Sequence, residues 1–264
     1  TNALRDFTLS GIDLPAQKQQ RYGEIQSKLS ELCSNFSNNV LDATQAFTVH
    51  IEDEAELAGL PKSALDAAAA LASSKDKAGW IFSLDIPSYL PVMTYCDNAQ
   101  LRETLYRAYV TRASELGPNA GEFDNTEVMT EIMALRHEVA NLLGFANYAE
   151  KSIATKMAES IEQVIGFLTD LAAKSKSQGQ QDLAELRDFA EQEFGVSSLN
   201  PWDLAYYSEK LKQNRYAISD EDLRPYFPEN KVVEGLFTVV NRLYGLEIKP
   251  RTGVDVWHND VKFY

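Results

Sequence analysis

The feature that most constrains the fold is a long run of helical periodicity near the start of the sequence. Between Pro15 and Thr44, apolar residues recur every three or four positions, at Tyr22, Ile25, Leu29, Leu32, Phe36 and Val40. A helix of ~30 residues is about 45 Å long, and such a narrow apolar seam needs a partner helix along its length. We expect this partner either elsewhere in the chain or in sequence upstream of it.

The same periodicity predicts helices over most of the remaining sequence. The predicted helices are Pro61–Ser73, about Asn98–Leu116, Asn125 to Gly144, Ser160–Phe194, one starting at Asn200-Pro201, one starting at Ser219, and Pro228–Tyr244. We predict Asn125 and Ser160 as N-terminal caps, and Gly144 and Gly195 as the residues that end their helices. In the Ser160 helix, Gly179 and its polar neighbours allow an interruption around Ser175–Gln181.

Three short segments have the composition of strands. They are Ala46–Ile51, Trp80–Ile86 (ended by Pro87) and the β-branched and aromatic Val254–Tyr264. The predicted fold class is therefore mainly α: a multi-helical array with long antiparallel helices and a few short β-strands. A sub-boundary near residues 75–100 would separate a long-helix region, 1–75, from residues 76–264.

Composition excludes some functions. The chain has 25 Lys and Arg against 39 Asp and Glu, a formal net charge of −14, which argues against a nucleic-acid-binding surface. No apolar run approaches the ~20 residues of a membrane span, and no secretory segment is present. Cys33 and Cys96 stand in no metal-ligand spacing. We expect two reduced, mostly buried thiols, although one disulfide is conceivable, and a reducing cytoplasm as the location.

Catalytic motifs are scarce. His137-Glu138-Val139-Ala140-Asn141 approaches the zinc-binding HExxH pattern, but asparagine replaces the second histidine, so the imidazole pair that grips the metal is missing. We therefore interpret His137 as an exposed or capping helix residue. There is no nucleophile elbow and no phosphate-binding glycine loop. We assign no catalytic or metal-binding residue to the chain.

Two aromatic segments are candidates for a binding role. In Trp202-Asp203-Leu204-Ala205-Tyr206-Tyr207, a helix places Trp202 and Tyr206 on one face and Asp203 and Tyr207 on the next. Tyrosine hydroxyls at a cavity rim could orient a peptide, but an aromatic packing stripe is the plainer interpretation. Tyr89 lies in the corner between Pro87 and Pro91, which either packs as a rigid turn or lines a cavity. We expect Pro91 in the first turn of the helix that follows this corner.

Several segments, in this order, resemble the thimet oligopeptidase family of zinc metallopeptidases. They are Leu84–Asn98 followed by Leu101–Tyr109, then Leu142–Ala149, Pro201–Tyr207, Tyr226–Pro228 and Val256–Val261. Each alone is weak evidence, but six in sequence over essentially the whole chain are specific. The resemblance implies part of a larger zincin-like oligopeptidase fold, in which a deep channel admits short unstructured peptides. We expect the face that carries Asp203 and Tyr207, and the corner at Pro87–Pro91, to border that channel.

The resemblance also implies that the HExxH helix, which holds zinc, lies beyond Tyr264. No initiator Met is present and the sequence stops at the apolar pair Phe263-Tyr264, so we expect an interior segment of a longer protein. Its partners would be peptides and the rest of the same polypeptide, and it would be inactive alone. The alternative is an acidic helical scaffold or protein-binding module without catalysis. The sequence that follows Tyr264 would distinguish the two.

Overall fold

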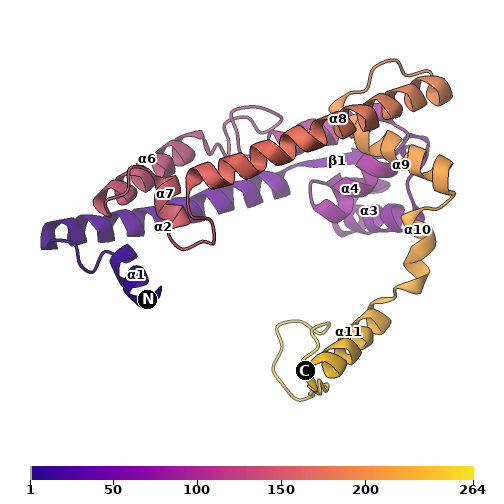
Figure 1. Cartoon of the computed structure of the whole chain (residues 1–264). Coiled ribbons are helices and arrows are strands. Elements are labelled where there is room, and N and C mark those ends of the chain that lie inside the picture. The colour runs from indigo at the N-terminus through magenta and orange to yellow at the C-terminus, as the bar shows by residue number, and fades with distance from the viewer. Residues whose placement is uncertain (1) are drawn as a thin grey trace. The chain divides into compact units, whose positions relative to one another are not determined.

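The computed structural model describes residues 2–264 and divides into two compact units, Thr1–Leu211 and Lys212–Tyr264. Its α-helices are α1 (Asn2–Leu9), α2 (Ala16–Ala46), α3 (Lys62–Ser74), α4 (Ile86–Tyr95), α5 (Ala99–Val110), α6 (Thr126–Leu142), α7 (Tyr148–Ile153), α8 (Ile161–Phe194), α9 (Leu204–Tyr216), α10 (Asp220–Leu223) and α11 (Glu229–Tyr244) (Figure 1). The strands are β1 (Thr48–Ile51) and β2 (Trp80–Ser83). The prediction of a mainly α fold is confirmed.

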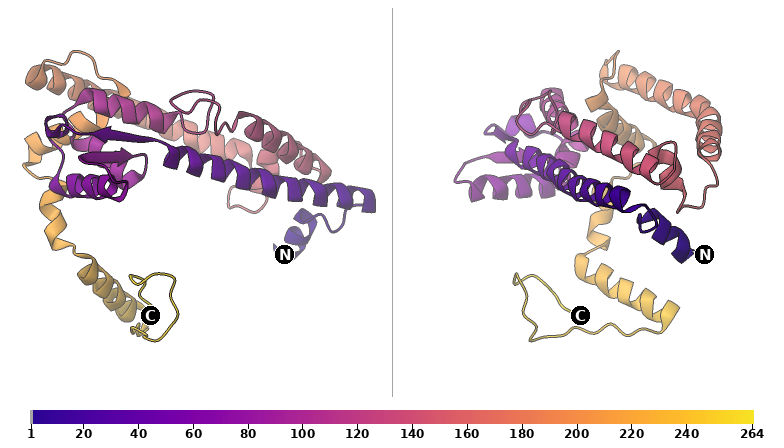
Figure 2. Two further views of the ribbon diagram at one scale, coloured as in Figure 1. Left: turned by 180° about the vertical axis from the view of Figure 1, so that it is seen from behind. Right: turned by 90° about the vertical axis from the view of Figure 1, so that its left-hand side faces the viewer.

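Helix α2 packs along α6, which is the partner that its apolar seam requires. Arg21 of α2 donates two hydrogen bonds to Glu138 of α6, at 2.7 and 2.8 Å. Farther along α2, Asn39 donates to Asn125, which precedes α6, at 2.9 Å. Because residue numbers rise along α2 while those of its partners fall, the helices are antiparallel, and Figures 1 and 2 show them side by side.

The core of the first unit surrounds a two-stranded antiparallel sheet. Strand β1 pairs with β2 in the register Thr48↔Ser83 to Ile51↔Trp80. Helices α3, α4 and α5 cover the sheet through buried side chains that include Ala68, Phe82, Leu84, Val92, Met93, Leu101 and Leu105. The sub-boundary predicted near residues 75–100 falls inside this unit and stays a prediction.

A smaller cluster joins the second half of α8 to α9. Ser160 caps α8 by accepting a hydrogen bond from the Gln163 amide, and Gly195 ends the helix in the left-handed conformation, as predicted. Leu186 and Ala190 of α8 pack against Tyr206 and Tyr207 of α9. The allowed interruption near Gly179 is absent from the described helix, because helix-forming neighbours outweigh the cost of about 1 kcal/mol for one glycine.

Two predictions about the Pro87 corner are wrong. Strand β2 ends at Ser83, before Pro87, and Pro87 lies in the first turn of α4. Proline is favourable there because the first helical amides have no intrahelical acceptor. Pro91 lies inside α4 instead of opening a helix, and its missing N–H removes one bond of that helix.

Two other local predictions also fail. Residues 254–264, all of them described, are not a strand; the segment is tied by a backbone bond from Arg251 N to Phe263 O at 2.8 Å and by packing of the Tyr264 ring on Phe237. Strand-forming residues become a strand only when a second strand pairs with them. The two thiols are free as predicted, with Cys96 buried, but Cys33 is exposed on α2.

Within residues 2–264, no helix has both the length and the apolar character that crossing a membrane requires.

Candidate functional site

The most elaborate polar arrangement is a buried ion pair between α5 and the start of α9. Arg102, 2% exposed, donates from Nη2 to Asp203 Oδ1 at 2.7 Å and from Nη1 to the Cys96 carbonyl at 2.6 Å. Its guanidinium carbon lies 4.1 Å from the centre of the Tyr206 ring. Among the described residues, Arg102 Nε is a buried side-chain nitrogen without a hydrogen-bond partner. We call Arg102, Asp203, Asp97 and Tyr206 the Arg102 junction.

Asp203 also closes the turn that begins α9. Its second oxygen accepts hydrogen bonds from the backbone and side-chain nitrogens of Asn200, at 3.0 and 3.2 Å. This is a capping box, a favoured way to satisfy the free amides of a helix start. The Asn200-Pro201 start predicted from the sequence is correct, although the first turn, Pro201–Asp203, is a 3-10 helix.

Asp97 and Tyr206 form the outer part of the junction. The Tyr206 hydroxyl donates to Asp97 Oδ1 at 2.7 Å, and Lys210 Nζ lies 3.4 Å from the same oxygen. The Asp97 loop approaches Gly59 closely: a Cβ atom there would lie 2.3 Å from the Tyr95 carbonyl oxygen. With φ at +87°, position 59 therefore suits only glycine.

The Arg102 junction is built to hold elements in place. A guanidinium is permanently charged and transfers no proton near neutral pH, and both Asp203 oxygens already accept hydrogen bonds. Burial and the hydrogen bond to Asp97 raise the pKa of the Tyr206 hydroxyl, so it stays protonated at neutral pH. The junction therefore fixes α9 and the end of α8 against α5.

Titration of Tyr206 gives a testable pH dependence. Because the folded-state pKa is raised above its ordinary value of 10.0, the stabilisation is complete below pH 10 and is lost as the pH rises through the raised value. Tyr206→Phe should lower stability by about 1 kcal/mol below pH 10. Above pH 10 the stability of the unsubstituted chain should fall more steeply with pH than that of the variant, because only the unsubstituted chain has the Tyr206 hydroxyl. The two slopes should differ by up to about 1.4 kcal/mol per pH unit. Urea unfolding at pH 9, 10 and 11 measures both effects, and parallel curves would contradict the assignment.

The structure places four of the five predicted candidates in packed positions. Asp203, Tyr206 and Tyr207 are buried, and the Tyr207 ring meets Phe194 edge-on. Tyr89 is buried as well; its ring stacks on Tyr109 with centroids 4.2 Å apart, and burial raises its pKa to about 12. These positions agree with the packing interpretation, and the channel role stays a prediction.

The fifth candidate, Trp202, is half-buried. It lies beside Tyr106, and the Arg107 guanidinium stands 5.0 Å from its ring. Asp203 and Tyr206 thus share the Arg102 junction, Trp202 and Tyr207 flank it, and Tyr89 lies in the separate sheet core.

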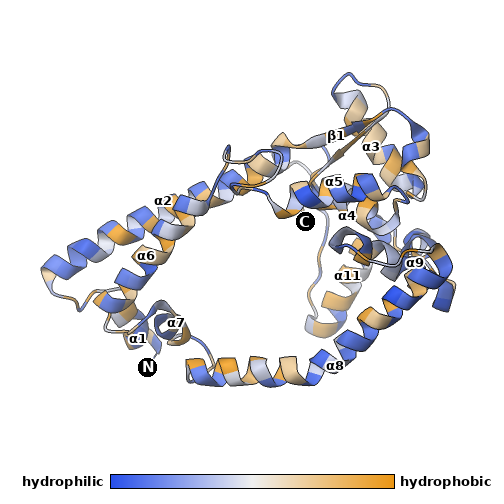
Figure 3. Cartoon of the chain, turned by 90° about the horizontal axis from the view of Figure 1, so that it is seen from above, coloured by the Kyte–Doolittle hydropathy of each residue, from blue (hydrophilic) through white to orange (hydrophobic). Residues whose placement is uncertain are grey.

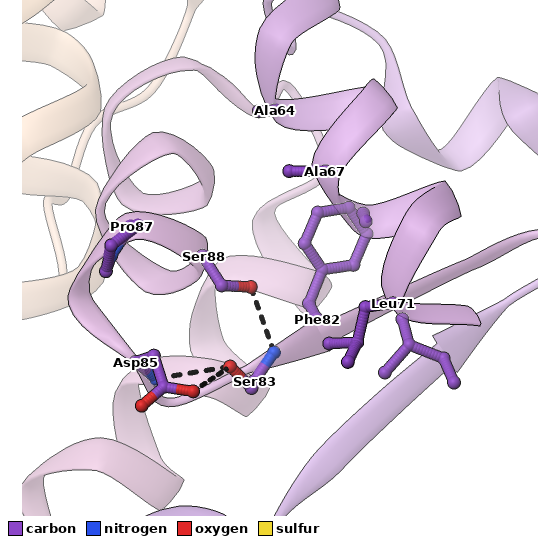
Figure 4. Close-up of a pocket in the computed structure, with 10 residues that line it drawn as sticks. Ala64, Ala67, Leu71, Phe82, Ser83, Asp85, Pro87 and Ser88 are labelled. Carbon is purple, nitrogen blue, oxygen red and sulfur yellow. Dashed lines mark hydrogen bonds between the residues drawn. The ribbon is translucent and has the colours of Figure 1, made fainter. Parts of the chain in front are cut away.

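A pocket of about 200 Å³ lies beside the Pro87 corner, between α3, β2 and the first turn of α4 (Figure 4). Its wall is mainly apolar, with Ala64, Ala67, Leu71 and Phe82. Its polar groups bond to one another: Ser83 N donates to Ser88 Oγ at 2.9 Å, and Ser83 Oγ donates to Asp85 at 2.8 Å. The predicted corner therefore does border a cavity, but these polar atoms are already engaged.

The described residues do not suit a metal ion. Across residues 2–264 there is no group of three or more His, Cys, Asp and Glu side chains that could hold one. His137 is exposed on α6, and its neighbour Glu138 accepts from Arg21, which lowers the pKa of that carboxyl.

Arg102 and Asp97 were not predicted as site residues from the sequence. Both lie within segments that carry the family resemblance, but nothing local distinguishes a buried arginine from an exposed one. The available signal was the position of Arg102 beside the apolar face formed by Leu101 and Leu105, where a charged side chain needs a buried counter-ion.

Comparison with known proteins identifies the family. The sequence profile of peptidase family M3 matches residues 92–264. Oligopeptidase A of Salmonella typhimurium is 66% identical over 263 residues, which cover 100% of this chain and 39% of that protein. Probable cytosolic oligopeptidase A of Arabidopsis thaliana is 42% identical, over 99% of this chain and 38% of that protein. Dipeptidyl carboxypeptidase of Escherichia coli is 27% identical, over 98% of this chain and 38% of that protein.

The chain therefore spans about two fifths of the length of these curated relatives. The resemblance found in the sequence is confirmed, including the similarity to bacterial oligopeptidase A. The chain belongs to peptidase family M3.

Proposed function

We propose that this chain is a segment of a zinc-dependent oligopeptidase that hydrolyses short, unstructured peptides in a deep channel. The main support is the 66% identity to oligopeptidase A along the whole chain. The segment supplies wall and substrate-restricting elements, and residues outside it hold the zinc.

The experiment compares the intact protein with the chain Thr1–Tyr264 on one short peptide. The intact protein should cleave the peptide, lose that activity on treatment with a chelator, and recover it with added zinc. The isolated chain should neither cleave the peptide nor retain zinc after purification. Zinc held tightly by the isolated chain, or cleavage by it, would contradict the proposal. An intact protein that cleaves no short peptide, with or without added zinc, would instead favour the acidic scaffold.

In this proposal, the five aromatic and acidic candidates border the substrate channel of the intact protein. Tyr207→Phe in the intact protein is the milder probe, because it removes one hydroxyl and keeps the ring that packs on Phe194. We expect peptide turnover to change by a few-fold, the effect of about 1 kcal/mol. Steady-state kinetics and thermal unfolding are measured together, and unchanged values of both would remove Tyr207 from the border.

We also place the intact protein in the cytoplasm, with neither nucleic acid nor membrane as a partner. The support is the net charge of −14 and the free thiols. One Arabidopsis relative is named a probable cytosolic oligopeptidase A.

A further inference from the structure

Helix α8 carries two groups of apolar residues on one face, and the described structure buries residues only in the group nearer its C-terminus. Steps of three and four residues run through Ile161, Ile165, Leu168 and Ala172, and after the polar stretch 175–182 they resume at Leu183, Leu186 and Ala190. Because such steps keep side chains on one side of a helix, both groups share one face. We call the first group the α8 stripe.

The second apolar group on this face of α8 packs against another helix of the same chain. Leu186 and Ala190 are 7% and 0% exposed, because Tyr206 and Tyr207 of α9 pack on them. These are the buried residues of α8. In the stripe, by contrast, Ile165 and Leu168 are 57% and 51% exposed. Figure 3 colours the first turns of α8 mostly orange and its middle blue, which matches an apolar start followed by a polar stretch.

An uncovered amphipathic helix needs an explanation. In proteins, most of the stability of a helix comes from packing of its apolar face and not from helix propensity alone. Leu171, which borders the stripe, is also about half exposed, at 49%. The whole chain, α8 included, aligns with oligopeptidase A, but it spans only 39% of that protein.

We propose that the α8 stripe is the docking face for the remaining three fifths of the same polypeptide, which contributes an apolar surface as α9 does farther along. This inference rests on the proposed function, which makes the chain part of a longer peptidase. Two observations select this occupant. The stripe continues a face that the polypeptide already covers with its own residues, and the relatives have sufficient additional length to cover the rest.

Thiol accessibility in the intact protein tests the proposal without unfolding it. Leu168→Cys places a thiol on the stripe, and Ala173→Cys places a matched thiol on the far side of the same helix, where Ala173 is exposed. Trypsin cuts after Lys156 and Lys174, so one fragment, 157–174, reports on both variants by mass spectrometry. Labelling in urea serves as the reference for equal intrinsic reactivity.

The thiol at position 168 should react roughly 100-fold more slowly than that at position 173 under native conditions, at every protein concentration. Equal rates would overturn the proposal, and would also follow if a different protein or a membrane were the occupant. Protection that appears only as the protein associates would assign the stripe to a second copy. Protection that requires added peptide would assign it to the substrate channel. Either of these results would overturn the proposal as well.

Peptidase activity measured on the same samples separates the two ideas. Slow labelling at position 168 without chelator-sensitive cleavage would leave the docking face in place and remove the proposed function. Chelator-sensitive cleavage with equal labelling rates would do the reverse.

Discussion

Replacing Asp203 with alanine should lower the free energy of unfolding of the chain by about 3–5 kcal/mol. Arg102 is 2% exposed, and without Asp203 its charge would remain buried with no carboxylate beside it. Arg102 Nε already has no partner among the described residues, so loss of the Asp203 bond would leave a second nitrogen of the buried guanidinium without its carboxylate acceptor. The substitution also removes the hydrogen bonds to Asn200 that begin α9, which adds to the loss.

Urea unfolding followed by circular dichroism measures this change, with Asp66→Ala as the matched control. Asp66 pairs with Lys62 at 2.7 Å, the same distance as Asp203 and Arg102, but the two side chains are 63% and 85% exposed. Water screens such a pair, so the control should cost less than about 1 kcal/mol. Equal losses in the two variants would show that burial of the Arg102 pair has no energetic consequence.

A double variant separates the buried charge from simple packing. Arg102→Met with Asp203→Leu removes both charges, so no unpaired ion remains. Replacing a buried pair by apolar groups is often neutral or stabilising, so we expect the double variant to be more stable than Asp203→Ala. If it were the least stable of the set, the ion pair itself would be the dominant stabilising feature.

The helices could be predicted from the sequence because their signals are local. The apolar seam of α2, the Ser160 cap and the glycine at position 195 act within a few residues, and all appear in the structure as expected. The position of Pro91 was predicted wrongly because the preference of proline for the first turn of a helix is only statistical. Packing of α4 in the sheet core stabilises the helix despite the proline inside it. The segment 254–264 was misjudged because strand composition is not enough without a pairing strand.

The Arg102 junction was beyond the reach of local rules. Arg102 and Asp203 are separated by 101 residues, and only the folding of α5 against the start of α9 brings their charges together. Asn125 is a second residue whose role depends on contacts that are distant in the sequence. Predicted as a cap, it is 2% exposed and instead bonds to Asn39 and to the Phe36 carbonyl of α2. Its side chain makes no capping bond, and the neighbouring Asp124 accepts from the Thr126 amide.

Phe82→Ala should lower the free energy of unfolding by about 3 kcal/mol, at the lower end of the range for buried phenylalanine. Phe82 is 1% exposed in β2, opposite Val49, and it packs in the sheet core with Leu84 and Val92. The substitution to alanine removes the ring and with it the apolar surface that the ring buries. The ring also forms part of the wall of the pocket beside the Pro87 corner, so the space left by truncation joins an existing cavity.

Phe167→Ala is the matched control, because Phe167 undergoes the same change in composition but is 65% exposed on α8. It should change the stability of the chain by less than about 0.5 kcal/mol. Phe82→Leu should fall between the two, since it keeps most of the apolar volume and sheds only part of the packing. A loss at position 82 no larger than that at position 167 would mean that the sheet core does not hold this unit together. The stability of the chain would then have to come from the α2–α6 pair, whose own polar contacts include the exposed and weakly stabilising Arg21–Glu138 bond.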